Sequence, residues 1–161
     1  MTASGAGSPR DSDDRAIAAL LGREPFTSHR VAVRCPHGGP AVLENDPVDL
    51  RGRPFPTRYW LSCRALGEAV SRLEAAGGVK RLEAETDLRE ALLAANARHA
   101  ELHGGRNVGG VRDPATVKCL HAHLAFGLAT GGNPVTEWIM RESGAAWPET
   151  CCVPAAPEAG A

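Results

Sequence analysis

Five cysteines are spread over most of the 161-residue chain, at positions 35, 63, 119, 151 and 152. Compact zinc modules hold their ion through C-x₂-C pairs, and the chain contains no such pair. Instead, 27 residues separate Cys35 from Cys63, and 55 residues separate Cys63 from Cys119. Any site that uses these thiols therefore requires a fold that brings distant segments together.

The charge balance and the hydropathy pattern exclude several classes of function. The chain has 18 basic and 19 acidic residues and a net charge of −1, so we expect no nucleic-acid binding. No apolar run approaches the ~18 residues of a membrane span, and the N-terminus lacks the features of a signal peptide. We therefore expect a cytoplasmic protein without membrane insertion. Its cysteines are then ligands, nucleophiles or core residues rather than disulfides.

The length fits one domain with a substantial core. Residues 1–11 are small and polar, and residues 153–161 are rich in proline and alanine. Neither segment buries enough apolar surface to offset its ordering entropy. We expect both to be disordered tails around a single domain at residues 12–152.

The first part of this domain has the pattern of a small antiparallel sheet. Residues 30–35 alternate apolar and polar side chains, and a Pro-His-Gly-Gly-Pro turn leads into residues 41–44, which predicts a hairpin. A proline-punctuated loop follows. The aromatic and apolar residues 58–63 then predict a third strand.

The remainder of the domain has helical patterns. Asp113-Pro114 is a strong start signal, because an acidic cap precedes proline at the first helical position. The predicted helices cover residues 13–21 with Ser12 as the cap, 65–75, 88–103, 113 to about 129, and 135–142. The predicted fold class is therefore α+β, a single domain in which a small antiparallel sheet of about three strands packs with four to five helices.

The cysteines lie mainly at the ends of elements and in turns, where side chains from distant segments can meet. A tetrahedral site built from Cys35, Cys63, Cys119 and one more ligand suits zinc. Four thiolates also suit an iron–sulfur cluster. The candidates for the fourth ligand are His123, Cys151 and Cys152.

Helix geometry separates the histidines that follow Cys119. At about 100° per residue, Cys119 and His123 point in similar directions and can reach one ion, whereas His121 points away. A distorted first turn would relax this restriction. The pattern therefore favours His123 on a regular helix.

Several runs of the sequence resemble a known family. LGREP, VAVRCPHGGPAVLE, GRPFPTRYWLSCRAL, SRLEAAG, VKCLHAHLA and NPV occur in the order and at the spacing of the bacterial family catalogued as domain of unknown function 501. The resemblance runs from about residue 20 to about residue 135. Where the family commonly reads D-G-T-P-F-P-T, this chain has arginines at positions 51 and 53.

The resemblance implies which residues matter. The cysteine of the RCP run and the cysteine and histidine of the KCLH run are characteristic of the family, and they correspond to Cys35, Cys119 and His121. The position after the YWL run, usually cysteine, corresponds to Cys63. Helix geometry favours His123 while the resemblance favours His121, so both assignments stay open. A helix that begins later or bends would allow His121 to join Cys119.

The sequence and the resemblance lead to three hypotheses about function. The first is a small metal-binding domain of unassigned biological role, with zinc as the ion and an iron–sulfur cluster as the alternative. The second is a small hydrolase-like enzyme with an open metal position or a Cys–His pair, for which the catalytic candidates are Cys35, Cys119 and His121. The third is a non-catalytic partner in a cell-division complex, because genes of the family often lie near those for a septum-formation protein and an exopolyphosphatase.

Overall fold

The computed structural model describes residues 9–153. Most of both predicted tails, at residues 1–8 and 154–161, lies outside the described residues. Within residues 9–153, no helix has the length and apolar character needed to cross a membrane.

The predicted hairpin and third strand form one antiparallel sheet. Its strands are β1 (His29–Arg34), β2 (Pro40–Asn45) and β3 (Tyr59–Leu61), in the order β1-β2-β3. The hairpin turn closes through the Cys35 backbone N–H, which donates to the Gly39 carbonyl over 2.8 Å. Gly38 in this turn has φ +84°, a conformation that glycine adopts without steric cost. The turn therefore fixes Cys35 at one end of the sheet.

In the described part of the chain, six α-helices accompany the sheet and confirm the α+β class in a single domain. They are α1 (Pro9–Leu21), α2 (Arg64–Ala75), α3 (Gly78–Ala84), α4 (Arg89–Leu102), α5 (Leu120–Ala129) and α6 (Pro134–Ser143). Short 3₁₀ turns, η1 (Thr86–Leu88) and η2 (Val108–Gly110), precede and follow α4. The sequence did not predict α3, because the glycine pair at 77 and 78 indicated only a stop.

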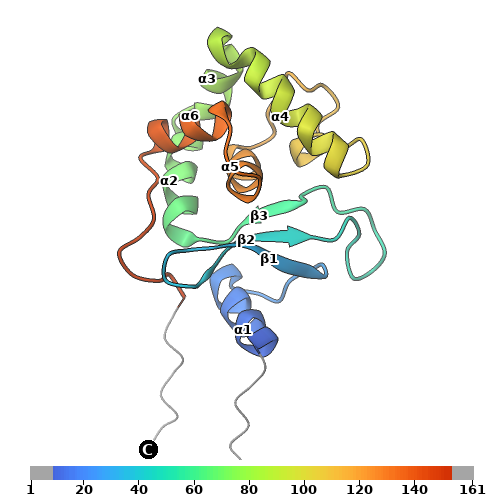
Figure 1. The fold of residues 1–161 in the computed structure, drawn as a ribbon, viewed down its shortest axis with the longest axis vertical. Helices are drawn as coiled ribbons and strands as arrows, with labels where there is room; N and C mark the ends of the chain where they lie inside the picture. The colour runs from blue at the N-terminus through green and yellow to red at the C-terminus, as the bar shows by residue number, and fades with distance from the viewer. Residues whose placement is uncertain (1–8, 154–161) are drawn as a thin grey trace, which may run out of the picture.

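The sheet lies between α1 on one face and the other helices on the opposite face (Figure 1). The centre of the helical layer is α5, which is apolar on almost every side; seven of its ten residues are buried. A helix that is hydrophobic all round belongs in a core. Its neighbours are β3, α2 and α6, so the elements that carry candidate ligands meet around it.

Two helix starts differ from the prediction. The helix α1 begins at Pro9, so Ser12 lies inside it rather than capping it. The second difference is larger: Asp113-Pro114 starts no long helix. Asp113 caps a single turn, accepting the backbone N–H of Ala115 at 2.9 Å, and the chain is then irregular until Leu120. A local capping signal stabilises one turn, but the packing of the following residues decides whether the helix continues.

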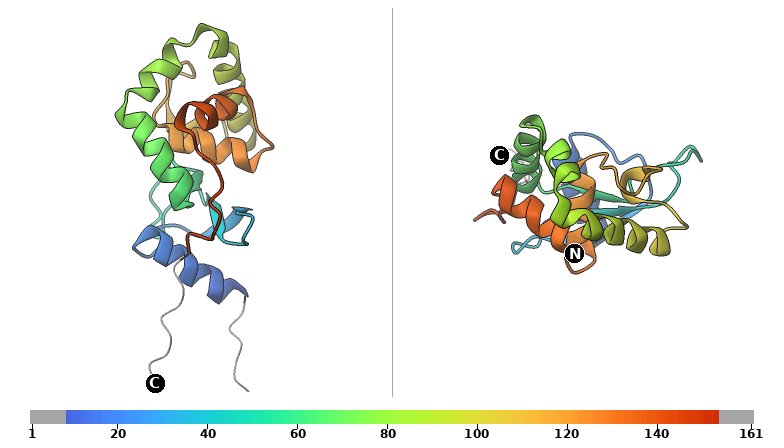
Figure 2. Two further views of the ribbon diagram at one scale, coloured as in Figure 1. Left: turned by 90° about the vertical axis from the view of Figure 1, so that its left-hand side faces the viewer. Right: turned by 90° about the horizontal axis from the view of Figure 1, so that it is seen from above.

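After α6 the chain leaves the helical layer and runs along the side of the molecule to the hairpin turn (Figure 2). Gly144, with φ +67°, ends the helix. The His37 Nε2–H group in the hairpin turn donates to the Pro148 carbonyl over 2.8 Å. The C-terminal segment, defined here as residues 145–153, is thus held against the end of the sheet that carries Cys35.

Candidate metal centres

Cys119 occupies the position just before α5 rather than a position within the helix. Its backbone is extended, with φ −155° and ψ 151°, and its Sγ accepts the backbone N–H of Ala122 at 3.4 Å. The regular helix assumed in the sequence analysis is therefore wrong at this residue. Because the helix begins later, the argument that turned His121 away from Cys119 no longer applies.

Glu74 reaches the same place from the last turn of α2. Its Oε1 accepts the backbone N–H of Leu120 at 2.6 Å. A carboxylate is unfavourable at the C-terminal end of its own helix, but favourable at the N-terminal end of another. The packing of α2 beside α5 therefore gives Glu74 a capping role that its own helix cannot provide.

His121 completes this cluster. Its Nδ1 lies 3.2 Å from Oε1 of Glu74, and its Nε2 lies 3.0 Å from the carbonyl of Gly67 and 3.1 Å from Oγ of Ser71. One ligand atom each from Glu74, Cys119 and His121 lies within 4.8 Å of the other two. Among the residues that the structure describes, no other trio of His, Cys, Asp and Glu meets that distance. We call this trio the Glu-Cys-His cluster.

All three members of the Glu-Cys-His cluster are partly exposed. Burial nevertheless raises the pKa of the Cys119 thiol, and the backbone N–H groups of Ala122 and His121 oppose that rise. The negative charge of Glu74 raises this pKa further. Cys119 therefore favours the neutral thiol unless a cation approaches.

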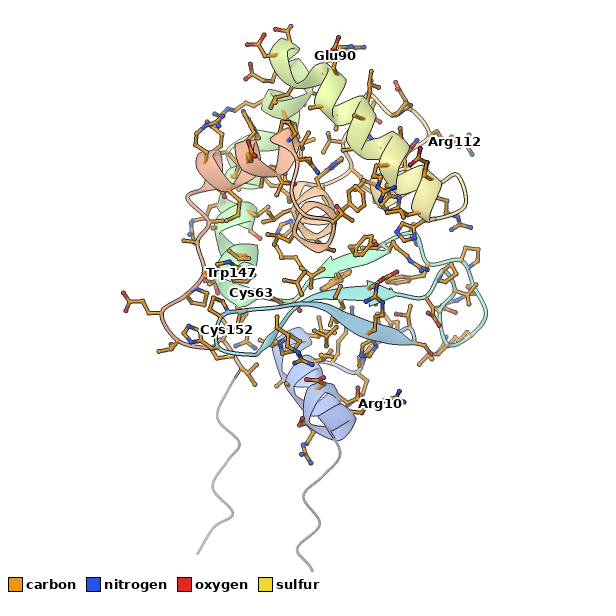
Figure 3. The ribbon with its side chains drawn as sticks, in the orientation of Figure 1. Arg10, Cys63, Glu90, Arg112, Trp147 and Cys152 are labelled. Atoms are coloured by element: carbon orange, nitrogen blue, oxygen red, sulfur yellow. The ribbon has the colours of Figure 1, made fainter. Side chains whose placement is uncertain are left out.

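The other four cysteines meet at a second place and line one small pocket, which we call the four-thiol pocket. The sulfurs of Cys35 and Cys151 are 3.9 Å apart. Cys63 and Cys152 interact in the same pocket, at the junction of α2, the hairpin turn and the C-terminal segment (Figure 3). All four are free cysteines.

Cys63 resembles Cys119 in its backbone position, since it lies just before α2. Burial raises the pKa of the Cys63 thiol, and the thiol of Cys152 adds to the rise. The backbone N–H groups of Leu66 and Ala65 oppose it. Both helix starts thus present a sulfur whose ionisation is resisted by burial and supported by backbone dipoles.

The structure divides the residues that the sequence analysis grouped together. Cys35 and Cys63 pack with the C-terminal cysteines in one core cluster, whereas Cys119 packs against another around Tyr59 and Phe126. At least one of the three distances between the sulfurs of Cys35, Cys63 and Cys119 exceeds 4.8 Å. The structure therefore does not bring these three thiols into one site. The physical reason for this separation is that Cys119 caps α5, whereas Cys35 and Cys63 lie at the hairpin end of the sheet.

His123 takes part in neither cluster. It is 2% exposed, and its Nε2 has no hydrogen-bond partner among the described residues. Burial, with a further contribution from the charge of His99, lowers the pKa of His123 to about 4. Its side chain is a neutral core residue, and His121 stands beside Cys119 instead.

Sequence reasoning missed Glu74. The signal that could have found it is a carboxylate in the last turn of a helix, where the helix dipole disfavours negative charge. Such a residue indicates a partner outside its own helix. The sequence does not say which partner, because the residue that Glu74 caps lies 46 positions later.

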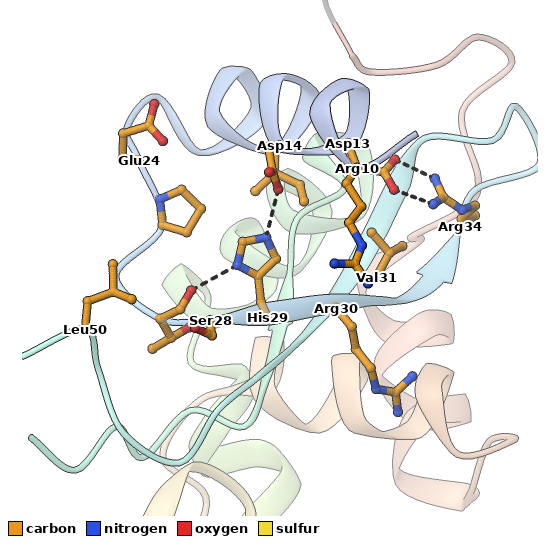
Figure 4. Close-up of a pocket in the computed structure, with 13 residues that line it drawn as sticks. Arg10, Asp13, Asp14, Glu24, Ser28, His29, Arg30, Val31, Arg34 and Leu50 are labelled. Atoms are coloured by element: carbon orange, nitrogen blue, oxygen red, sulfur yellow. Dashed lines mark hydrogen bonds and ion pairs between the residues drawn. The ribbon is translucent and has the colours of Figure 1, made fainter. Parts of the chain in front are cut away.

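A cleft between α1 and β1 lies on the opposite face of the sheet (Figure 4). Arg34 donates to both carboxylate oxygens of Asp13, at 2.9 and 2.6 Å, and this pair lowers the pKa of Asp13. His29 Nε2 lies 3.8 Å from Asp14, and its Nδ1 hydrogen-bonds the Thr27 carbonyl. These contacts tie α1 to the sheet.

Comparison with known proteins gives one family. The family model described as "Protein of unknown function (DUF501)" matches residues 31–104 and 89–141. No curated protein and no solved structure matches the chain.

Proposed function

The chain belongs to the DUF501 family of proteins of unknown function, and we propose that it is a metal-binding domain whose zinc ion is held by the Glu-Cys-His cluster at the start of α5. The family carries no assigned activity, so the proposal rests on the geometry of Glu74, Cys119 and His121.

The main observation that supports this proposal is the hydrogen bonding of His121. The carbonyl of Gly67 can only accept, so the Nε2 that faces it at 3.0 Å bears the hydrogen and donates. In a neutral imidazole, Nδ1 is then an acceptor. It faces the carboxylate of Glu74, also an acceptor, at 3.2 Å. Two acceptors at this distance require a hydrogen or a cation between them, which is a second proton on the imidazole, a proton on the carboxyl group or a metal ion.

The surroundings favour the metal ion over the proton. A thiol, an imidazole and a carboxylate are the donor types that zinc takes in proteins. Histidines that bind metals through one ring nitrogen commonly donate the other N–H to a backbone carbonyl, as His121 does to Gly67. The Leu120 N–H group also orients the Glu74 carboxylate. These contacts would hold two of the three ligands in place before an ion arrives.

A second candidate function is a zinc-dependent hydrolase. Its supporting observation is that the cluster offers three ligands and is partly exposed. Three protein ligands with an open fourth position are typical of catalytic zinc, which lowers the pKa of a bound water and makes it a nucleophile near neutral pH. Hydrolysis of p-nitrophenyl acetate and p-nitrophenyl phosphate provides a first measurement. Zinc-dependent turnover that Glu74→Gln abolishes would support this function, and no turnover above the buffer rate counts against it.

The proposed site is tested by zinc quantitation of the full chain and its variants. We expect Glu74→Gln and Cys119→Ser each to lose about one equivalent of zinc. Glu74→Gln keeps a side-chain oxygen that can accept the Leu120 N–H group, so the cap on α5 persists.

The matched control is Glu83→Gln. Glu83 also accepts a backbone N–H group, that of Val117 at 2.8 Å, but it is not part of the cluster. This variant should keep its full zinc content. Unchanged zinc in both Glu74→Gln and Cys119→Ser would remove the proposal and leave an imidazolium–carboxylate pair in its place.

A further inference from the structure

We infer that the four-thiol pocket is a second, closed zinc site, in which Cys35, Cys63, Cys151 and Cys152 fasten the C-terminal segment to the sheet and to α2. This site is independent of the Glu-Cys-His cluster and goes beyond the proposed function.

The separation of one pair of sulfurs fits two ligands of one ion. A Zn–S bond of about 2.3 Å and a tetrahedral angle place two ligating sulfurs about 3.8 Å apart. The sulfurs of Cys35 and Cys151 are 3.9 Å apart. Cys63 and Cys152 form the second interacting pair in the same pocket. No three of the four sulfurs lie within 4.8 Å of one another in the described residues, so binding of an ion would have to draw the two pairs together to complete a four-thiolate site.

The space inside the pocket also fits one ion. Its free volume is about 10 Å³, no more than a single water molecule needs. An organic ligand is excluded by that volume, and so is a four-iron cluster, which takes each cysteine on a separate iron. Apart from the thiols, the described residues that line the pocket offer apolar side chains and backbone, and none of them offers a competing charged ligand.

Gly39 shows how closely the chain packs around the sulfurs. A Cβ atom at this position would lie 2.5 Å from Sγ of Cys151 and 3.3 Å from Sγ of Cys35. Its φ is not in the left-handed region, so glycine is required for space rather than for backbone conformation. The turn therefore leaves room for two sulfurs and for nothing larger beside them.

The C-terminal segment gains most from such an ion. It has no regular secondary structure, and the His37 contact to Pro148 is its hydrogen bond to the hairpin turn. It packs through Trp147 and the two cysteines against a core cluster that contains Cys35 and Cys63. A structural zinc site contributes folding free energy directly, because its ligands are gathered only in the folded chain.

The binding step balances without an oxidant. Four S–H bonds break, four Zn–S bonds form, and four protons pass to solvent. A pair of disulfides would instead require oxidation.

Zinc quantitation and cobalt substitution of the full chain test the inference. The chain purified under reducing conditions should contain about two equivalents of zinc, and Cys151→Ser and Cys152→Ser should each lower this to about one. These two cysteines are partly exposed, so their replacement disturbs folding less than replacement of the buried Cys35 or Cys63. Glu83→Gln, which lies in neither cluster, is the control that should keep both equivalents. Cys119→Ser removes a thiol from the other cluster and should also lose about one equivalent, so cobalt absorption is needed to distinguish it.

Cobalt(II) reports on the number of thiolates around the ion, because thiolate-to-cobalt absorption grows with each sulfur ligand. We expect Cys151→Ser to remove most of this absorption and Cys119→Ser to remove about one-fifth of it, one thiolate in five. Limited proteolysis should cut the C-terminal segment of Cys151→Ser faster than that of Cys119→Ser.

The inference is overturned by any of three results. These are full zinc content in both Cys151→Ser and Cys152→Ser, disulfides in the alkylated protein by mass spectrometry, and iron in place of zinc. Failure of the Glu-Cys-His cluster is recognised separately, because Glu74→Gln and Cys119→Ser report on that cluster and not on the four-thiol pocket.

Discussion

Cys63 and Cys119 stand just before the helices α2 and α5, and burial raises the pKa of both thiols. Their companions differ. Cys63 meets only other thiols in an apolar pocket, whereas Cys119 meets a carboxylate and an imidazole at a partly exposed position. The same backbone setting can therefore serve a closed site that stabilises the fold or an open site with a free coordination position. The neighbours of the thiol decide which one results.

The largest expected effect is a difference in melting temperature between the Cys63→Ser and Cys119→Ser variants. Cys63→Ser should lower the melting temperature by roughly 10 °C, because a closed site contributes folding free energy and this thiol is 4% exposed. Cys119→Ser should change it by less than about 3 °C, because serine is itself a good helix cap and can accept the Ala122 N–H group. Differential scanning calorimetry of both variants makes the comparison. Equal losses would contradict the division into a closed and an open site.

A smaller effect is expected from crowding the four-thiol pocket. Gly39→Ala places a methyl group against the sulfurs of Cys151 and Cys35, which should cost about 2 kcal/mol, or about 5 °C in melting temperature. Its zinc content should fall by up to one equivalent. Gly67→Ala is the control, since nothing lies within 4 Å of the added Cβ and the position is helical. A Gly39→Ala protein as stable as Gly67→Ala would show that the pocket is loose.

Acid is expected to lower the melting temperature by a few degrees because His103, which belongs to neither cluster, becomes protonated on unfolding. Burial, followed by the charges of His99 and Arg58, lowers the pKa of His103 to about 4, while Glu44 opposes this shift. The unfolded chain, with a histidine pKa near 6.5, then binds more protons than the folded chain between these values. The contribution of His103 to the free energy of unfolding is fully present above about pH 6.5 and is lost as the pH falls toward 4.

His103→Phe should flatten this part of the pH dependence while keeping a ring beside Tyr59. Melting temperatures from pH 7 to pH 4.5, measured on zinc-loaded and on chelated protein, separate this effect from release of the ions. A pH dependence that His103→Phe leaves unchanged in the chelated protein would assign it to other buried groups such as His99 and His123, whose pKa values burial also lowers. A dependence that disappears on chelation would assign it to the metal sites.

The smallest expected effect concerns His123, the ligand that helix geometry favoured. Its buried Nε2 has no partner among the described residues, and an unsatisfied buried group costs about 1–3 kcal/mol. His123→Leu should therefore raise the melting temperature by about 3 °C and keep the full zinc content. Loss of one zinc equivalent in this variant would return His123 to the ligand set and break the assignment of His121.

The sequence by itself determined the hairpin, the third strand and the fold class. The β-branched Val31 and Val33 lie between Arg30 and Arg34, and the Pro-His-Gly-Gly-Pro turn begins at residue 36, so residues close in sequence specify these elements. The glycines at 22, 77 and 131 likewise end helices at the expected places, with φ between +69° and +91°. Such signals act over a few residues, through backbone conformation and capping.

Only the tertiary structure decided where the ligands meet. Asp113 has the local signature of a long helix, yet the helix starts at Leu120, where Glu74 from α2 supplies the cap. That shift of start places His121 beside Cys119. The return of the C-terminal segment likewise places Cys151 beside Cys35, 116 positions away. These contacts depend on how α5 is buried and how α2 and the C-terminal segment pack, and that packing involves residues far apart in the chain.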